Sequence, residues 1–329
     1  MANNQNLGFD HRFAVGPAGS TLEFTVDILS STVKVMSEVL DATGLTGVRD
    51  HRSDRTRRGI QRVGGQLTIA ASPRALDWFM PYILGGSEST DVYSVADTLP
   101  GFDLWDDVLG DGTYISEFGE LYVNRFSLAL RGGGAGSGIL TFTLDVIGKT
   151  FDKDIAAGNT WSTGANWKGG TEVALKSTAG FDDPYTFWDS TITLFGGSVA
   201  IDEGELVIDN ALDVRFRNSR TAVSIRPTDR TVSFSSNVPL DSTALANYFI
   251  DKAAADATLV LYNGSPGVTT TFALNDLAVA DEGPDVRGRG DVPLILRGNA
   301  RANSTTDSVQ ATLAETSGDL WTNTTATYH

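Results

Sequence analysis

Cysteine is absent from this chain of 329 residues, and histidine is rare. The lack of thiols excludes structural disulfides, thiolate nucleophiles and cysteine-ligated metal sites. The three histidines, His11, His51 and His329, are not spaced as metal ligands on one strand or helix. The sequence therefore predicts no metal site, no cofactor and no histidine-based active site.

Long apolar runs and a surplus of basic residues are missing as well. No stretch has the length of a membrane span, and residues 1–6 lack the basic and apolar regions of an export signal. The formal net charge is −16 and the sequence pI is near 4.5, which argues against a protein that wraps nucleic acid. We expect a soluble chain that is made in a cytoplasm and does not insert into membranes.

Residues that favour strands and tight turns are plentiful. The chain contains 35 glycines and 16 phenylalanines, and 41% of its residues are hydrophobic. Together with many threonines and valines, this composition is typical of strands joined by tight turns. The length allows two ordinary domains or one large β domain.

One pattern of strand followed by helix occurs twice. Residues 63–69 alternate in polarity and lead into an apolar helical face that carries the aromatic pair at 78–79. In the second copy, residues 230–234 alternate and the aromatic pair at 248–249 ends the segment. This repetition predicts a duplicated architecture.

The duplication predicts two tandem domains of mainly β structure. Each is expected to be a β-sandwich or partly open barrel with one short α-helix, because closely spaced strands bury one face each. The predicted boundaries are an N-terminal arm at 1–19, a first domain at 20–151, a connector at 152–188, a second domain at 189–316 and a C-terminal tail at 317–329.

Alternating segments predict three hairpins. Residues 21–29 and 33–40 are expected to form a first hairpin, and residues 121–130 and 139–147 a long one across a glycine-rich loop. A final pair is expected at 269–280 and 291–300. Between strands of the second half, residues 215–226 are expected to form a polar loop rich in arginine.

A second basic loop is predicted in the first half, since no apolar periodicity survives between residues 44 and 59. Three interpretations are open for it: a solvated mobile loop, a nucleic-acid patch, and docking on an acidic protein surface. The acidic chain and the lack of an aromatic platform argue against nucleic acid, and arginine forks pair well with carboxylates. The arginines of residues 49–62 are Arg49, Arg52, Arg55, Arg57, Arg58 and Arg62.

Three further patterns have possible chemical roles. The acids Asp103, Asp106, Asp107 and Asp111 do not follow the spacing of a calcium loop, which favours a solvated acidic loop. The glycine-rich loop at 132–138 joins strand to strand and precedes no helix, so a phosphate cradle is not expected there. Trp161, Trp167 and Trp188 either anchor the connector or stack on sugars.

These aromatic residues support one alternative function and the acids another. The first is a carbohydrate-binding β-sandwich module. The second is a glycosidase that uses paired carboxylates, but no spacing among the 41 acidic residues singles out a pair. We therefore expect a non-enzymatic protein.

Several motifs, taken in order, resemble one family. They are RVGGQL at 62–67, LGG at 84–86, YVNRFSL at 122–128, FTLDVIGK at 142–149, LVIDNALD at 206–213 and RPTDRTV at 226–232. In this order, and with the duplication, the sequence resembles the tail tube (major tail) proteins of long-tailed bacteriophages of the siphophage type, in the two-repeat form. The resemblance covers roughly residues 20–315.

The resemblance implies a structural virion protein whose rings stack into a tube that conducts DNA from capsid to host. In that family the barrel sheets line a lumen and a long loop reaches into the adjoining ring. The loop at 44–62 is the matching position, so the inter-ring contact residues would be Arg49, Arg52, Arg55, Arg57 and Arg58.

The resemblance also implies partners. Three chains with two tube domains each would form a homotrimeric pseudo-sixfold ring, with a homohexamer as the alternative. The tube would meet tail terminator and tail-tip proteins at its ends, hold the tape measure protein and passing DNA in its lumen, and assemble in the host cytoplasm.

Overall fold

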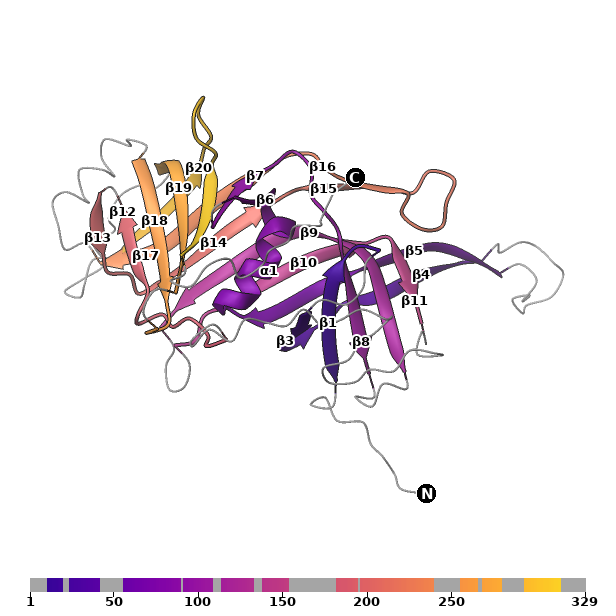
Figure 1. Cartoon of the computed structure of the whole chain (residues 1–329). Helices are drawn as coiled ribbons and strands as arrows, with labels where there is room; N and C mark the ends of the chain where they lie inside the picture. The colour runs from indigo at the N-terminus through magenta and orange to yellow at the C-terminus, as the bar shows by residue number, and fades with distance from the viewer. Residues whose placement is uncertain are drawn as a thin grey trace, which may run out of the picture.

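The computed structural model describes residues 11–19, 24–41, 56–89, 91–108, 114–132, 138–153, 182–194, 196–239, 255–265, 268–279 and 293–314. Within these ranges the chain forms one helix and 21 strands, and the strand pairs are antiparallel (Figure 1). The prediction of a mainly β fold is confirmed.

A long central sheet runs through both halves of the sequence. At one edge, β3 (Ile28–Ser31) and β4 (Lys34–Asp41) pair one after the other with the long strand β5 (Thr56–Ala70). From β5 the sheet continues in the order β10 (Thr141–Gly148), β9 (Ile115–Arg131), β14 (Glu203–Asp209), β17 (Thr231–Pro239), β20 (Pro293–Ala300) and the end of β19 (Thr269–Val279). Inward side chains alternate with outward ones along these strands, as the sequence pattern predicts.

The two halves of this sheet share one strand order. The first is β4, β5, β10 and β9, and the second is β14, β17, β20 and β19. Residues 63–70 pair with 148–141, and residues 232–239 pair with 300–293, so each half contains a run of eight matched pairs. The halves join where β9 pairs with β14.

Two smaller sheets and a hairpin complete the strands. One sheet contains β2 (Phe24–Val26), β1 (Arg12–Pro17), β8 (Phe102–Asp107), the first part of β9, and β11 (Thr150–Asp152). The other contains β13 (Gly197–Val199), β12 (Thr191–Leu194), β18 (Ala255–Tyr262), β19, β21 (Val309–Ala314), β7 (Val92–Val95) and β6 (Gly85–Ser89). The hairpin consists of β15 (Leu212–Arg215) and β16 (Ser224–Pro227).

The helix α1 (Pro73–Leu84) lies between the central sheet and the sheet of β7, β19 and β21. The side chain of Ser72 accepts a hydrogen bond from the N–H of Ala75 at 3.2 Å, and Pro73 suits the first helical position. Gly85 ends the helix in the left-handed conformation at φ 89°. In the described part of the chain, no helix combines the length and hydrophobicity that a membrane crossing needs.

The hydrophobic core is continuous between the halves. Phe126 of β9 is fully buried, and its ring centroid lies 5.8 Å from that of Phe142 in the first half and 6.2 Å from that of Phe272 in the second. All three belong to one cluster that also contains most of α1. Apolar side chains from both halves therefore exclude water together.

Several local predictions are confirmed. Residues 63–69 lie in β5, the apolar helix follows as α1, and the long hairpin is the pair of β9 and β10. The predicted second helix falls at residues 240–254, outside the described residues. The predicted domain boundaries remain predictions, because strand pairing and core alone do not define where each domain ends.

Other local predictions are wrong. β3 and β4 do not form a hairpin, because each pairs with β5 in turn. β5 begins at Thr56, so the last part of the predicted basic loop is strand. The predicted loop at 215–226 is confirmed for residues 216–223, while Arg215 and residues 224–226 belong to β15 and β16. The final predicted pair meets only at residues 278–279 and 298–299, since most of β19 pairs with β18 and β21.

Two buried tyrosines bring hydroxyls into the core. The hydroxyl of Tyr93 donates to Oδ1 of Asp77, which is 3% exposed on α1, and the hydroxyl of Tyr185 lies 2.7 Å from that of Thr270. Burial raises the pKa of Tyr93 above its ordinary value, and the Asp77 carboxylate raises it further. Burial also raises the pKa of Tyr185.

Alkaline pH is therefore expected to destabilise the protein. Because both folded-state pKa values lie above the unfolded value of 10.0, the contribution of these tyrosines is complete below that pH and is lost as pH rises past it. Tyr93→Phe is expected to cost about 1–3 kcal/mol at pH 7, since Asp77 loses a donor, and to flatten the alkaline decline. Urea unfolding between pH 7 and 11 measures both effects, and parallel curves for variant and wild type would contradict the prediction.

Candidate functional site

The face of the central sheet that points away from α1 is lined by hydroxyls in its middle rows. Thr68, Thr143 and Ser127 are cross-strand neighbours, and the hydroxyls of Thr68 and Thr143 lie 3.4 Å apart. The same row continues through Val207 to Ser233. Short hydroxyl side chains at these positions leave a flat, hydrated surface.

Charged side chains of both signs alternate on this face. Arg125 stands opposite Asp145 on one side and Asp209 on the other, and its Nη2 lies 4.0 Å from Oε1 of Glu205. The hydroxyl of Ser127 donates to the same Oε1 at 2.5 Å. Of the described outward side chains of β9, β10, β14, β17 and β20 in this sheet, the arginines are Arg125, Arg131 and Arg297 and the acids are Asp145, Glu203, Glu205 and Asp209. Lys34 and Arg62 lie on the same face toward the ribbon.

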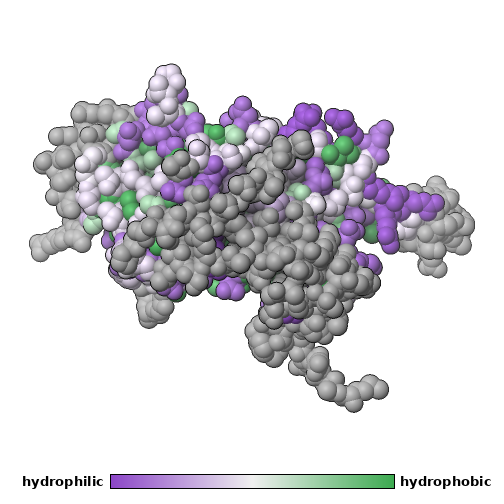
Figure 2. Space-filling view, in the orientation of Figure 1, coloured by the Kyte–Doolittle hydropathy of each residue, from purple (hydrophilic) through white to green (hydrophobic). Residues whose placement is uncertain are grey.

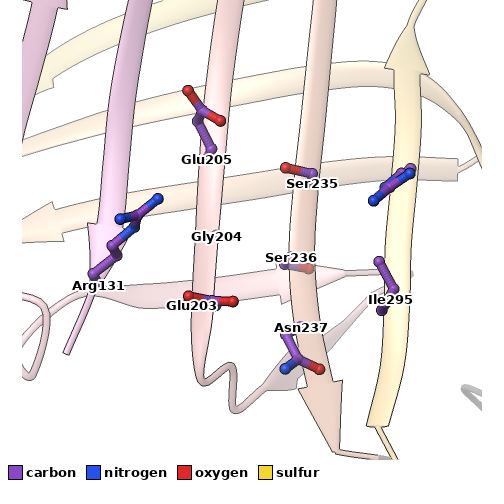
Figure 3. Close-up of a pocket in the computed structure, with 9 residues that line it drawn as sticks. Arg131, Glu203, Gly204, Glu205, Ser235, Ser236, Asn237 and Ile295 are labelled. Atoms are coloured by element: carbon purple, nitrogen blue, oxygen red, sulfur yellow. The ribbon is translucent and has the colours of Figure 1, made fainter.

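A hollow of about 230 Å³ opens on the face at one end of these strands (Figure 3). Its lining combines Arg131 of β9, both glutamates of β14, polar residues of β17, and Ile295 and Arg297 of β20. Figure 3 shows Glu203 and Glu205 on the strand between Arg131 and Ser235. The hollow thus brings together side chains of both charges, and among the residues that the structure describes no group of three or more histidines and acids could hold a metal ion.

Two of the five predicted contact arginines, Arg57 and Arg58, lie at the other end of the sheet, where β4 and β5 project as a two-stranded ribbon (Figure 1). Arg57 and Arg58 are exposed on β5 and pair with Leu40 and Val39 of β4. Figure 2 shows a strongly hydrophilic surface on this projection. The other three predicted arginines, Arg49, Arg52 and Arg55, lie outside the described residues.

The hairpin of β15 and β16 lies against this ribbon. The N–H of Gln61 donates to the carbonyl of Arg220 at 2.7 Å, and the guanidinium of Arg62 lies 5.6 Å from the ring centroid of Phe216. The sequence had assigned both basic segments to loops in separate domains. No local pattern could show that they lie together, because the contact joins residues about 160 positions apart.

Large apolar side chains are exposed on the ribbon. Met36 is 48% exposed, Val39 66% and Leu40 50%. From the sequence, residues 33–40 were expected only as the second strand of a hairpin, and their exposed apolar side chains were missed. The sequence does contain a signal for them, because residues 33–40 have apolar side chains at both odd and even positions. Such a pattern predicts a strand that is covered on both faces.

The aromatic connector reaches the described structure at residues 182–190. Trp188 is 70% exposed, and its indole lies over the two ends of the glycine-rich loop, Gly132 and Gly138. A Cβ at Gly138 would collide with Nε1 of this indole. The end glycines therefore make room for Trp188, whereas Trp161 and Trp167 lie outside the described residues.

We expect Gly138→Ala to displace the Trp188 ring, because the new methyl occupies its place. The variant should shift and quench the tryptophan emission with little loss of stability, about 1 kcal/mol or less, since the ring is largely exposed. Trp188→Phe with and without Gly138→Ala serves as the control. An emission change that persists in the Trp188→Phe background would contradict this explanation.

The acids considered for calcium are held by other groups. Asp103 accepts the N–H groups of Gly19 and Glu120, both at 2.8 Å, and Oδ2 of Asp107 lies 2.7 Å from Nη2 of Arg12. Oδ1 of Asp106 lies 3.4 Å from Nδ1 of His11, and burial raises the pKa of Asp106. Asp111 lies outside the described residues.

Comparison with known families gives this mainly β chain its place. No curated protein matches it. The family model described as "Phage tail tube protein" matches residues 13–314. This range includes every described residue except His11 and Arg12. A match over this much of the chain shows the family, and the chain belongs to the phage tail tube proteins.

Proposed function

We propose that this protein closes into siphophage-type rings that stack into a tube and conduct DNA from capsid to host. The family already makes it a structural virion component that assembles with itself and other tail proteins into a tail tube. The observation that supports ring closure is the joint between β9 and β14, where seven consecutive residue pairs connect the two halves of one chain.

The first half carries a strand edge that is equivalent to β14. Ser31 pairs with Leu67 and Met36 with Arg62, and in the second half Gly204 pairs with Ser236 and Asp209 with Thr231. Under the shared strand order, residues 30–36 and 203–209 thus occupy the same place. β14 has a neighbour on its other side, whereas no described strand pairs with the outer side of residues 30–36.

An unpaired edge invites another chain. We infer that residues 30–36 of one copy pair with the outer edge of the next copy's second half, at β19. This pairing would resemble the one between β14 and β9 inside one chain. Three chains would then supply six equivalent four-strand units and form a homotrimeric pseudo-sixfold ring. A homohexamer is the alternative.

The exposed face of the central sheet would line the lumen. On β9, β10, β14, β17 and β20 its three arginines alternate with four carboxylates, so phosphates would meet no unbalanced row of cations there and DNA could slide. The tape measure protein would occupy the same lumen before DNA. Tail terminator and tail-tip proteins would meet the open ends, and the inter-ring contacts would include Arg49, Arg52, Arg55, Arg57 and Arg58.

Negative-stain electron microscopy of the purified chain tests ring closure. The wild type should give rings and tubes whose top views show the symmetry. The N–H of Thr32 donates to the carbonyl of Gln66 in β5. Because successive N–H groups along a strand point to opposite sides, the N–H of Val35, three residues later, points away from β5. Val35→Pro removes that outward donor and should abolish rings, whereas Val35→Ala, which loses the side chain but keeps the N–H, should retain them.

Two outcomes would contradict this proposal. The first is a wild type that stays monomeric at high concentration and forms no ring under any salt condition. The second is a folded Val35→Pro variant, checked by circular dichroism, that forms rings as the wild type does.

A further inference from the structure

The two ends of the central sheet differ in charge. The basic end consists of the ribbon residues 34–41 and 56–63 and the hairpin residues 212–227. It contains eight basic and three acidic residues, in a chain whose formal net charge is −16. The basic residues are Lys34, Arg57, Arg58, Arg62, Arg215, Arg217, Arg220 and Arg226.

The acidic end consists of residues 182–190 and 196–203. It contains five acidic residues, which are Asp182, Asp183, Asp189, Asp202 and Glu203, and no basic residue. Asp182 pairs with Arg74 of α1 at 2.7 Å, and Glu203 stands opposite Arg131 of β9, with which it lines the hollow. By sequence the residues of the basic end have a net charge of +5 and those of the acidic end −5, and Arg74 and Arg131 stand beside the acidic end.

Strand register places these ends at opposite ends of the same strands. β14 starts at Glu203 in the acidic end and runs to Asp209, directly before the hairpin of the basic end. β5 starts in the ribbon and finishes at Ala70 beside Thr141, and the N–H of the neighbouring Leu140 donates to the carbonyl of Tyr185 in the acidic end. A copy shifted along the strand direction would thus bring unlike ends together.

Each end also exposes apolar side chains. Trp188, 70% exposed, directly precedes Asp189 in the acidic end, and its ring lies over Gly132 and Gly138. Ile139, which pairs with Thr186, is 46% exposed. At the basic end, Val39 and Leu40 are exposed next to Arg58 and Arg57. An apolar centre with a charged rim is the usual composition of a specific protein interface.

We propose that the basic end of one copy docks head to tail on the acidic end of a second copy of this chain. Trp188 meets the apolar side chains of β4, and the arginines of the ribbon and hairpin pair with the carboxylates around it. The proposal rests on the proposed function, since it names the receiving surface between adjoining rings. Such a heterologous contact does not close on itself, so it repeats along one axis and gives the stack a direction.

Charge reversal tests this contact. Arg57→Glu with Arg58→Glu makes the basic end repel the acidic end, and Asp202→Lys with Glu203→Lys does the converse. Each double variant should form rings that stack on the order of tenfold less than the wild type, because like charges then face each other. The chain with all four changes has both ends reversed and should recover stacking. Lys153→Glu with Arg301→Glu changes the net charge by as much as the arginine double variant, at two exposed residues outside both ends, and should stack as the wild type does.

Stack length and ring formation are scored separately in the same micrographs. Normal stacking of either double variant, or no recovery in the fourfold variant, would overturn the proposal even if rings form. If the wild type forms no rings, sedimentation velocity over a range of salt concentrations still decides. Association that weakens with salt, is lost in each double variant and returns in the fourfold variant supports the contact, and its absence refutes it.

Discussion

Asn210→Ala is expected to lower the free energy of unfolding by about 3–5 kcal/mol. Asn210 is fully buried, and its Nδ2 donates to the carbonyls of Ile83 and Val123, both at 3.1 Å. Its Oδ1 accepts from Nε of Arg230 at 2.9 Å. Alanine would leave two buried carbonyls without this donor and take an acceptor from a partly buried guanidinium.

The cost is large because Arg230 is difficult to satisfy otherwise. Burial lowers the pKa of this arginine, and its Nη2 already donates to the carbonyl of Ala96 at 3.0 Å. Thermal and urea unfolding measure the loss. Asn299→Ala, which truncates an exposed asparagine of β20, should stay within about 0.5 kcal/mol of the wild type. A loss of less than 1 kcal/mol at Asn210 would show that water replaces the side chain.

Asn210 also shows the limit of sequence analysis. It stands in the motif at 206–213 that carried part of the family resemblance, yet its type and position give no sign of a buried role. Its partners are the end of α1 and β9 in the first half, together with Arg230 in the second. Long-range partners of this kind follow from strand order, which periodicity does not determine.

Periodicity succeeded where a local rule decides the structure. Residues 63–70 alternate because one side of β5 faces the core, and Ser72, Pro73 and Gly85 mark the limits of α1. Both features could be predicted from neighbouring residues alone. The strand order is repeated between the halves, but the predicted duplication of strand and helix stays a prediction, because residues 240–254 lie outside the described residues.

Pairing partners were predicted less well. The strands predicted at 21–29 and 33–40 were expected to pair with each other, but β3 and β4 both pair with the 15-residue strand β5, which is long enough for two partners in succession. β21 was missed, although residues 309–314 alternate in burial, because its threonine and alanine residues give little contrast. Of the candidate site, the arginines of the ribbon were predicted, while the hairpin beside them and the acidic end were not.

Phe126→Ala is expected to destabilise both halves together, by about 3–5 kcal/mol. Its ring is fully buried between Phe142 and Phe272, and no small rearrangement of the paired strands β9 and β14 can fill the space. Two tandem domains with separate cores would instead lose stability in the first half only. The continuous core therefore predicts one cooperative transition at a lower temperature, which calorimetry measures.

Hydrogen exchange shows whether the loss reaches the second half. Peptides from β5 and from β18 should both exchange faster in Phe126→Ala, and by similar factors, because global unfolding exposes both. Phe216→Ala removes an aromatic ring from the hairpin, outside the core, and should cost about 1 kcal/mol or less and leave both peptides protected. Unchanged protection of β18 in Phe126→Ala would mean that the halves unfold independently, and the pairing of β9 with β14 would then be a docked seam between two domains. Equal acceleration would make that pairing part of a single folding unit, which is what a rigid joint inside a ring requires.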